Sequence, residues 1–222
     1  FRENTSLIPS RAAWSAERKI LCVVGERLGG MPGRALIVDL RTGNQLTEPL
    51  EFNNPVETAA FDATGKILAI ADDSGSVQLF DPSTGEKLGI PMVHPDSVSE
   101  LRFSADGRLL LTCCRDLNVR LFDVATSTEV TSPLVHQNET GTAEFIGTSY
   151  DVLTSGDGGT IWHVPRHRFS AEQAAAYSRY WSGTTMSERG AIIPVSAERL
   201  SIDQTDAAAD PVGLPSTVES VN

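Results

Sequence analysis

The chain has 222 residues, with 29 Asp and Glu against 18 Lys and Arg, which gives a formal net charge of −11. This acidic balance argues against binding to nucleic acid or to an anionic membrane, because both require a basic face. No apolar stretch reaches the roughly 18 residues that a membrane span requires, and no charged-then-apolar start indicates a signal peptide.

A repeat of 42 residues is the strongest pattern in the sequence, and a period of about 40–45 is typical of β-propeller blades. A generic β-sandwich would give similar strand lengths but would not hold a fixed register. Four kinds of residue recur at this spacing: Phe61, Phe103 and Phe145; Asp39, Asp81 and Asp123; Pro49, Pro91 and Pro133; Gly43, Gly85 and Ser127.

In chain order, residues 1–10 are expected to be a partial strand of a preceding blade or a segment that closes the ring, and residues 11–165 to be four blades. One unit shows the pattern clearly, with short apolar runs at 57–62, 66–72, 76–81 and 86–90 separated by turns rich in Gly, Asp and Ser. Such runs predict an all-β fold of four-stranded antiparallel meanders. No helical period of useful length occurs between residues 11 and 165.

The repeat resembles the WD-repeat family. Residues 94–123, HPDSVSELRFSADGRLLLTCCRDLNVRLFD, follow the family pattern almost position for position, with Phe122 in the place of Trp. Residues 136–164 keep Trp162 but have His163 in place of Asp, and are two residues shorter. The resemblance implies about four blades of a larger ring; the alternative is a small four-bladed ring closed by NTSLIP at residues 4–9.

Two other units depart further from the family pattern. In the unit at residues 57–91, Phe52 stands where His is expected, and Ile70 and Ser74 replace Thr and Asp. In the first unit, Trp14 replaces the recurring Phe, and an insertion of about five residues precedes the strand ALIVD.

The resemblance also implies a hydrogen-bonded tetrad of His, Ser/Thr, Asp and Trp that holds each blade together. The residues that match it are His94, Thr112 and Asp116 in one unit, where Phe122 cannot donate, and His136, Thr154, Asp157 and Trp162 in the next. A similar trio could suggest a hydrolase. Because it recurs once per blade, a structural role explains it better, and we expect no catalytic residue.

The three cysteines, Cys22, Cys113 and Cys114, fall in expected inner strands and are interpreted as buried reduced thiols. They favour a reducing compartment, so a cytoplasmic location is expected. No further Cys or His pair stands at metal spacing, so neither a metal nor a cofactor is predicted. The chain begins at Phe1 rather than Met, which favours the C-terminal part of a longer polypeptide.

Residues 166–202 are expected to form a helical appendage, opened by the capping box of Ser170 and Gln173. Residues 203–222 are expected to be a disordered acidic tail. The order of blade and tail resembles the C-terminal propeller region of bacterial, planctomycete-type WD-repeat serine/threonine kinases. That resemblance implies a kinase domain outside this chain, which carries no kinase motif of its own.

These patterns predict a non-catalytic scaffold for protein–protein interaction. One alternative is a regulatory or sensory propeller in cis to a serine/threonine kinase; another is part of a propeller enzyme whose active site lies in other blades. The loops that should share one end lean acidic, which suits a basic protein or peptide. The partner-binding candidates are Asp72, Asp73, Asp96, Arg115, Gln137 and Asn138, with Asp116 beside them.

Overall fold

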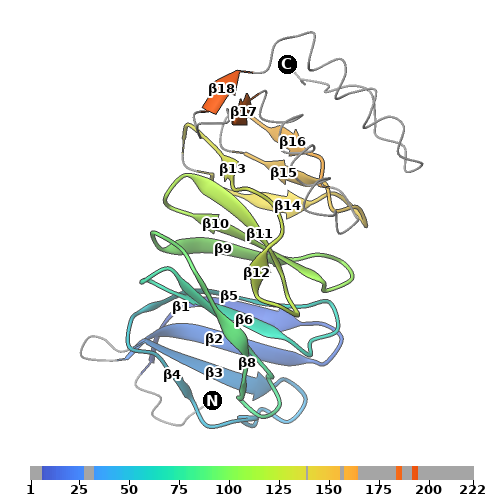
Figure 1. Ribbon diagram of the computed structural model, residues 1–222. Helices are drawn as coiled ribbons and strands as arrows, with labels where there is room; N and C mark the ends of the chain where they lie inside the picture. Colours follow the sequence, from blue (N-terminus) through green and yellow to red (C-terminus); the bar gives the residue numbers. More distant parts are fainter. Residues whose placement is uncertain are drawn as a thin grey trace. The chain divides into compact units, whose positions relative to one another are not determined.

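The computed structural model describes residues 7–27, 33–138, 140–155, 158–164, 184–186 and 192–194. The chain divides into two compact units, Phe1–Val164 and Pro165–Asn222. All elements assigned within the described residues are β-strands (Figure 1). The fold is therefore all-β, as the repeat predicts.

The first unit contains four antiparallel sheets, each following the previous one along the chain. The first has β1 (Leu7–Ser15), β2 (Ile20–Arg27), β3 (Gly33–Asp39) and β4 (Leu50–Glu51), and the second has β5 (Val56–Phe61), β6 (Leu68–Asp72), β7 (Ser76–Phe80) and β8 (Lys87–Val93). The third has β9 (Val98–Phe103), β10 (Leu109–Cys114), β11 (Asn118–Asp123), β12 (Thr128–Glu129) and β13 (Leu134–Val135), and the fourth has β14 (Ala143–Phe145), β15 (Val152–Thr154) and β16 (Thr160–Trp162).

Each sheet is a meander whose first strand contacts the first strand of the next sheet. Strand β5 contacts β1 and β9, and β9 contacts β14. The first three sheets have a strand paired outside the third one, which in the third sheet is split into β12 and β13. These meanders have the form of β-propeller blades, seen in succession from blue to orange in Figure 1.

The recurring aromatic residue has the same partner position in every blade. Phe61 pairs with Leu68, Phe103 with Leu110 and Phe145 with Val152 in the first hairpin of their sheets. Trp14 pairs with Leu21 at the same separation, so it takes the place of Phe in the first blade.

The recurring Asp and Gly form the turn that follows the third strand. The residue four positions after each Asp donates its backbone N–H to the Asp carbonyl, over 2.7 Å from Gly43 to Asp39 and 2.8 Å from Gly85 to Asp81. Ser127 makes the same bond to Asp123 at 2.8 Å. These three residues have φ of 73°, 77° and 57°, a left-handed region in which only glycine is unstrained. The third blade therefore places a serine where the turn favours glycine.

The recurring proline interrupts the outer strand of the first three blades. In the second blade, Val77 pairs with Met92 and Leu79 with Leu88, so β8 carries two more residues than β7 between the two pairs. The third blade repeats this two-residue excess, with Val119 paired to Leu134 and Phe122 to Glu129. Pro91 and Pro133 lie inside these bulges. A proline bulge at an outer edge opposes pairing with another sheet, because proline has no N–H to donate.

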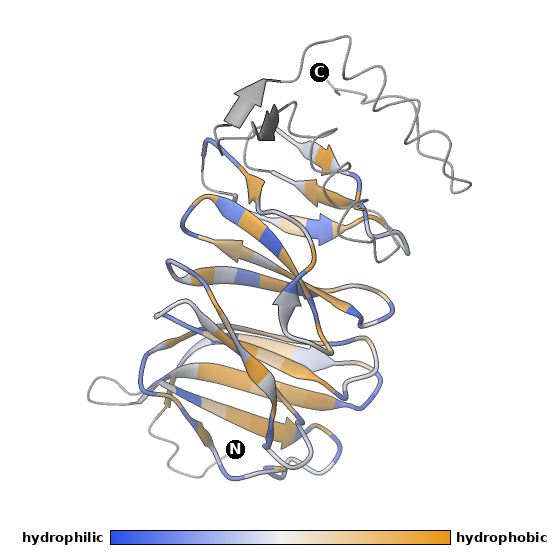
Figure 2. Cartoon of the chain, in the orientation of Figure 1, coloured by the Kyte–Doolittle hydropathy of each residue, from blue (hydrophilic) through white to orange (hydrophobic). Residues whose placement is uncertain are grey.

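Hydrophobic cores lie between successive blades, and Figure 2 shows apolar residues along their strands. One core joins the first and second blades around Ile37 and Leu68, and another joins the second and third around Leu79 and Leu101. The third joins the third and fourth blades around Leu121 and Val152. All three cysteines are free and buried, and burial raises the pKa of the Cys22 and Cys113 thiols to about 12.

The first blade begins earlier in the structure than the expected boundary at residue 11. Strand β1 begins at Leu7 and pairs with β2, so residues 7–10 belong to the first blade. Their pairing places this strand inside the first blade rather than on the fourth; residues 1–6 lie outside the described residues.

In the second unit, the structure describes a hairpin of β17 (Thr184–Met186) and β18 (Ile192–Pro194). The rest of the expected helical appendage at 166–202, and the expected tail at 203–222, lie outside the described residues.

Candidate partner-binding site

Two sets of loops meet at one end of the blades, which we call the loop-bearing end. It comprises the turns after the second strands, at residues 72–75 and 114–117, and the described parts of the connectors between blades, at residues 52–55, 94–97, 136–138 and 140–142. Backbone N–H groups of Asp73 and Arg115 donate to the carbonyls of Pro55 (2.8 Å) and Ser97 (3.0 Å). Each turn is thereby held to the connector that enters its own blade.

The same turns are also held to the connector that leaves the blade. The backbone N–H of His94 donates to the Gly75 carbonyl at 3.0 Å, and that of His136 donates to the Leu117 carbonyl at 3.0 Å. On the entering side of the third blade, the Sγ of Cys114 also donates to the Asp96 carbonyl at 3.2 Å. The loops are therefore fixed by a repeated set of backbone bonds, which gives a rigid surface for binding.

The candidate binding residues divide by exposure. Asp72 is only partly exposed, and its carboxylate accepts hydrogen bonds from the backbone and hydroxyl of Ser74 and from the backbone of Ser76, so it shapes the turn. Asp96 accepts the Ser97 N–H at 2.7 Å through one oxygen. The exposed candidates are Asp73, Asp96, Arg115, Gln137 and Asn138.

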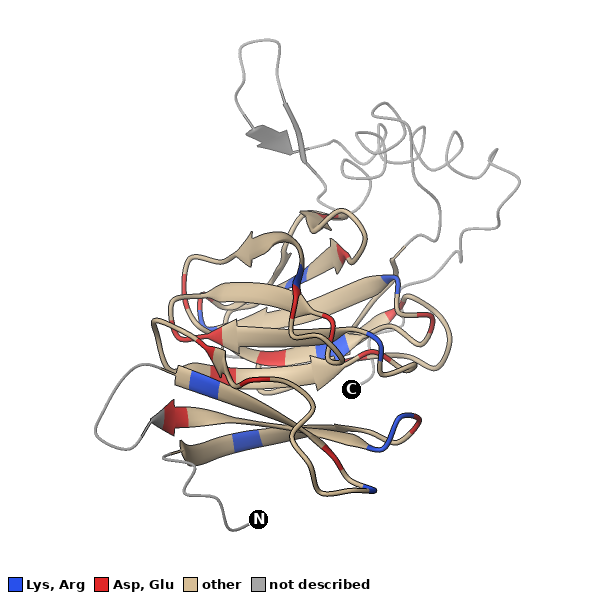
Figure 3. Cartoon of the chain, turned by 90° about the horizontal axis from the view of Figure 1, so that it is seen from below, with Lys and Arg blue, Asp and Glu red and all other residues tan. Residues whose placement is uncertain are grey.

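The charge at this end is predominantly negative, as the sequence suggests. The guanidinium of Arg115 lies 3.9 Å from the Glu57 carboxylate, so the two charges partly offset each other. Asp73 and Asp96 remain exposed beside that pair. Figure 3 shows where acidic and basic residues lie along the blades and turns. A cationic group that approaches these loops would meet two carboxylates.

Beneath the loops, the predicted tetrad residues of the third blade are partly brought together. Nδ1 of His94 lies 3.0 Å from the Gly75 carbonyl, and Nε2 lies 2.8 Å from Thr112 Oγ1. Because a carbonyl can only accept, Nδ1 carries the proton and Nε2 accepts the Thr112 hydroxyl. Burial lowers the pKa of His94, although the bond to Gly75 opposes this shift. The ring of Phe122 packs 5.2 Å away between centroids.

Asp116 does not join His94, which departs from the tetrad expected for this blade. Its carboxylate accepts hydrogen bonds from Arg120 Nη1 (3.1 Å) and Nη2 (2.6 Å) and from the Asn118 backbone. Burial alone would raise the pKa of Asp116, but the bonds from Arg120 hold it well below the usual range. A bidentate guanidinium is a stronger partner than a neutral imidazole, which explains the pairing.

Arg120 was not among the residues singled out from the sequence. It lies opposite Thr112 in the β10–β11 register and also contacts Glu129 over 3.2 Å. Its spacing of four residues from Asp116 was the available signal.

In the fourth blade, Trp162 donates from Nε1 to Thr154 Oγ1 over 2.9 Å. His136 is buried, and its ring and the Trp162 ring form a T-shaped pair with 5.4 Å between centroids. The fourth expected member, Asp157, lies outside the described residues. The three described residues of this set are therefore neighbours, with the indole supplying the hydrogen bond that Phe122 cannot.

In the second blade, apolar side chains occupy the tetrad positions. We call the side chains at these positions, polar or apolar, the brace of a blade. Phe52 and Phe80 meet edge to face at 5.9 Å, and Ile70 is fully buried in the same core. These residues hold the positions of His94, Phe122 and Thr112. The brace is interchangeable between polar and apolar sets, so its role is structural. Since His94 and Thr112 are buried, a substrate cannot reach them.

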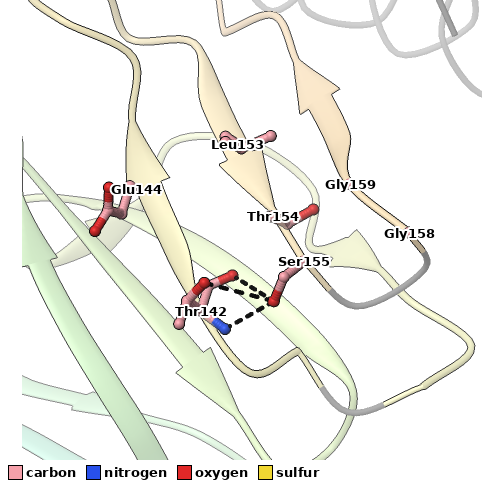
Figure 4. Close-up of a pocket in the computed structure, with 7 residues that line it drawn as sticks. All are labelled: Thr142, Glu144, Leu153, Thr154, Ser155, Gly158 and Gly159. Atoms are coloured by element: carbon pink, nitrogen blue, oxygen red, sulfur yellow. Dashed lines mark hydrogen bonds between the residues drawn. The ribbon is translucent and has the colours of Figure 1, made fainter. Parts of the chain in front are cut away.

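A hollow of about 340 Å³ lies on one face of the fourth blade (Figure 4). Ser155 Oγ accepts the Thr142 N–H there at 3.0 Å, and the lining residues that the structure describes include no imidazole or Asp to activate it as a nucleophile. The lining residues are Thr142, Glu144, Leu153, Thr154, Ser155, Gly158 and Gly159.

This hollow belongs to a face of the fourth blade that no other described strand of the first unit covers. On this face, Leu153 of β15 pairs with Ile161 of β16, and the two residues are 46% and 43% exposed. At the same register in the third blade, Leu111 and Leu121 are fully buried against the fourth blade.

Among the residues that the structure describes, no helix is long and apolar enough to span a membrane, and no cluster of His, Cys, Asp and Glu could hold a metal ion.

The comparisons with known proteins agree with blades of this class. Residues 85–123 match the family model "WD40: WD domain, G-beta repeat", which covers the outer strand of the second blade and the first three strands of the third. WD repeats in general mediate protein–protein interactions, and propellers built from them are in general non-catalytic. A comparison with curated proteins finds no match to this chain.

Among solved structures, the chain is similar to the "computationally designed Ika4 protein", with a TM-score of 0.59 and 18% sequence identity. The match covers 73% of this chain and 95% of the designed one. At this identity the likeness shows the fold alone.

Proposed function

We propose that this chain is a non-catalytic WD-repeat scaffold that binds a basic protein or peptide segment at its loop-bearing end. The observation that carries the proposal is the exposed pair of carboxylates, Asp73 and Asp96, on loops fixed by repeated backbone hydrogen bonds. Because these loops are rigid before binding, the free-energy cost of ordering the site when a partner binds is small.

We also propose that further blades of the same polypeptide cover the open face of the fourth blade. The support is that Leu153 and Ile161 are exposed at positions that are buried in the third blade. The chain would then be the C-terminal part of a larger ring. We propose a cytoplasmic location as well, and its support is the set of three free thiols, which suits a reducing compartment.

A second candidate is a regulatory propeller in cis to a serine/threonine kinase. The order of blade and C-terminal tail in the sequence favours it, and it uses the same binding end. The propeller-enzyme alternative requires an active site outside this chain and draws no support from its described residues.

The test is a selection of random peptides displayed on phage against the full chain. We expect the enriched peptides to be rich in Lys and Arg and to bind more weakly as salt rises, since screening weakens exposed charge pairs. Asp73→Asn combined with Asp96→Asn should weaken their binding at least tenfold. Asparagine keeps an oxygen that can accept the Ser97 N–H, so the loop should stay folded.

The matched control removes two exposed carboxylates that lie outside the loop-bearing end, with Glu48→Gln and Glu86→Gln. It makes the same change in net charge and should leave binding unchanged. Equal binding by both double variants would show that the loop-bearing end is not the site, and a failure to enrich any peptide would contradict peptide binding altogether.

A further inference from the structure

Leu117 has a backbone conformation that its residue type disfavours. Its φ is 67°, in the left-handed region where a side chain with a Cβ is strained. The sister position in the second blade is Gly75, with φ of 83°, and Gly158 and Gly159 of the fourth blade have φ of 93° and 91°. The carbonyls of Gly75 and Leu117 accept the same bond, from the N–H of the following connector. The turn therefore requires this conformation, and leucine is the unfavourable choice.

Core packing does not account for the leucine. Cys113 and Val119, on the strands either side of the turn, belong to the core between the third and fourth blades. Leu117 is partly exposed and is not among the side chains that form or border that core in the described part of the chain. Residues that keep a strained conformation without a packing reason concentrate at functional sites.

The surroundings of Leu117 combine apolar and acidic groups. Val135, which pairs with the adjacent Asn118, is 68% exposed. The Asp96 carbonyl accepts the Cys114 thiol, which sets the connector that carries the Asp96 carboxylate against this turn. A partner segment that reaches Asp96 with a cation therefore has an apolar surface beside it.

We infer that Leu117 is an apolar anchor for the partner, so that the recognised segment carries an apolar side chain next to a Lys or Arg. This inference rests on the proposed function and adds the apolar half of the recognised motif. Glycine at position 117 would be better for the stability of the fold. On this inference, leucine is retained there because its side chain contacts the partner.

The test measures binding of the phage-selected peptides and the thermal midpoint for three variants of the full chain. Leu117→Gly should raise Tm by roughly 2–4 °C because strain is relieved, and should weaken peptide binding at least tenfold. Leu117→Ala should weaken binding similarly with little change in Tm, because alanine keeps the strain. The matched control is Lys19→Gly, at another strained turn (φ 56°), between β1 and β2, which should raise Tm without changing binding.

Two results would overturn the inference: a Leu117→Gly variant that binds as the parent does, or one that is no more stable than the parent. If the Asp73 and Asp96 variant loses binding while Leu117→Gly does not, only the anchor is wrong. If neither variant loses binding, the proposed function fails as well.

Discussion

The polar brace of the third blade should be replaceable by the apolar brace of the second. His94→Phe and Thr112→Val together reproduce the pattern of Phe52, Ile70 and Phe80, since Phe122 already matches Phe80. The Gly75 carbonyl would keep the backbone N–H of residue 94 as its donor. No buried polar atom of the pair would then be left without a partner.

Each single change breaks the 2.8 Å bond between His94 and Thr112 from one side. The remaining buried polar atom costs about 2 kcal/mol, which for a chain of this length lowers Tm by roughly 4–8 °C. The double variant removes both groups and should lie within about 1 kcal/mol of the parent. The two changes should therefore be coupled by about 3 kcal/mol in favour of the double variant.

Urea unfolding of the parent, the two single variants and the double variant gives this coupling directly. The pH dependence gives a second readout. Because the pKa of folded His94 lies below its unfolded value of about 6.5, the unfolded state takes up the proton first as pH falls. The stability contribution is present above that pH and is lost on acidification, so the parent should lose more stability than the double variant between pH 7.5 and 5.

Additive effects would refute this reasoning. If the double variant is destabilised by the sum of the two single changes, the hydrogen bond does not determine the energetics of the brace. An unchanged loss of stability on acidification in the double variant would show that another group is responsible for the pH dependence.

Three further predictions concern individual side chains. Ser127→Gly should raise stability by about 1 kcal/mol, because it relieves a φ of 57° and removes a buried hydroxyl that lacks a partner among the described groups; an unchanged Tm would contradict the strain. Trp162→Phe should lower stability by about 1 kcal/mol through loss of the bond to Thr154, again measured by unfolding, and equal stability would show that the bond is dispensable. Cys22 and Cys113 should resist a thiol reagent at pH 8 until the chain unfolds, since their pKa is about 12; rapid labelling of the native chain would contradict their burial.

The repeat was sufficient to predict the blades because its residues act locally. Phe61 and its counterparts mark the same hairpin position, and Asp39 and its counterparts accept the bond that closes a turn. Both depend on neighbours a few residues away, so spacing alone reveals them. The bulges around Pro91 and Pro133 use equally regular spacing, yet their register shift depends on pairing with β7 and β11 and could not be read from the sequence.

The site was less predictable because its pairings compete. Asp116 had two possible partners, and only the register that sets Arg120 opposite Thr112 shows why the guanidinium is chosen over His94. The strain at Leu117 was also hidden, because a leucine gives no sign of a positive φ. The grouping of the loops at one end was predicted, since alternate turns of a meander share an end.

Hydrogen–deuterium exchange of the full chain, with and without a saturating phage-selected peptide, tests the binding end most directly. We expect new protection of backbone amides at residues 72–75, 94–97 and 114–117, with the outer strands β8 and β12 unchanged. Protection on the open face of β15 and β16 instead, with no change in those three loops, would contradict the account.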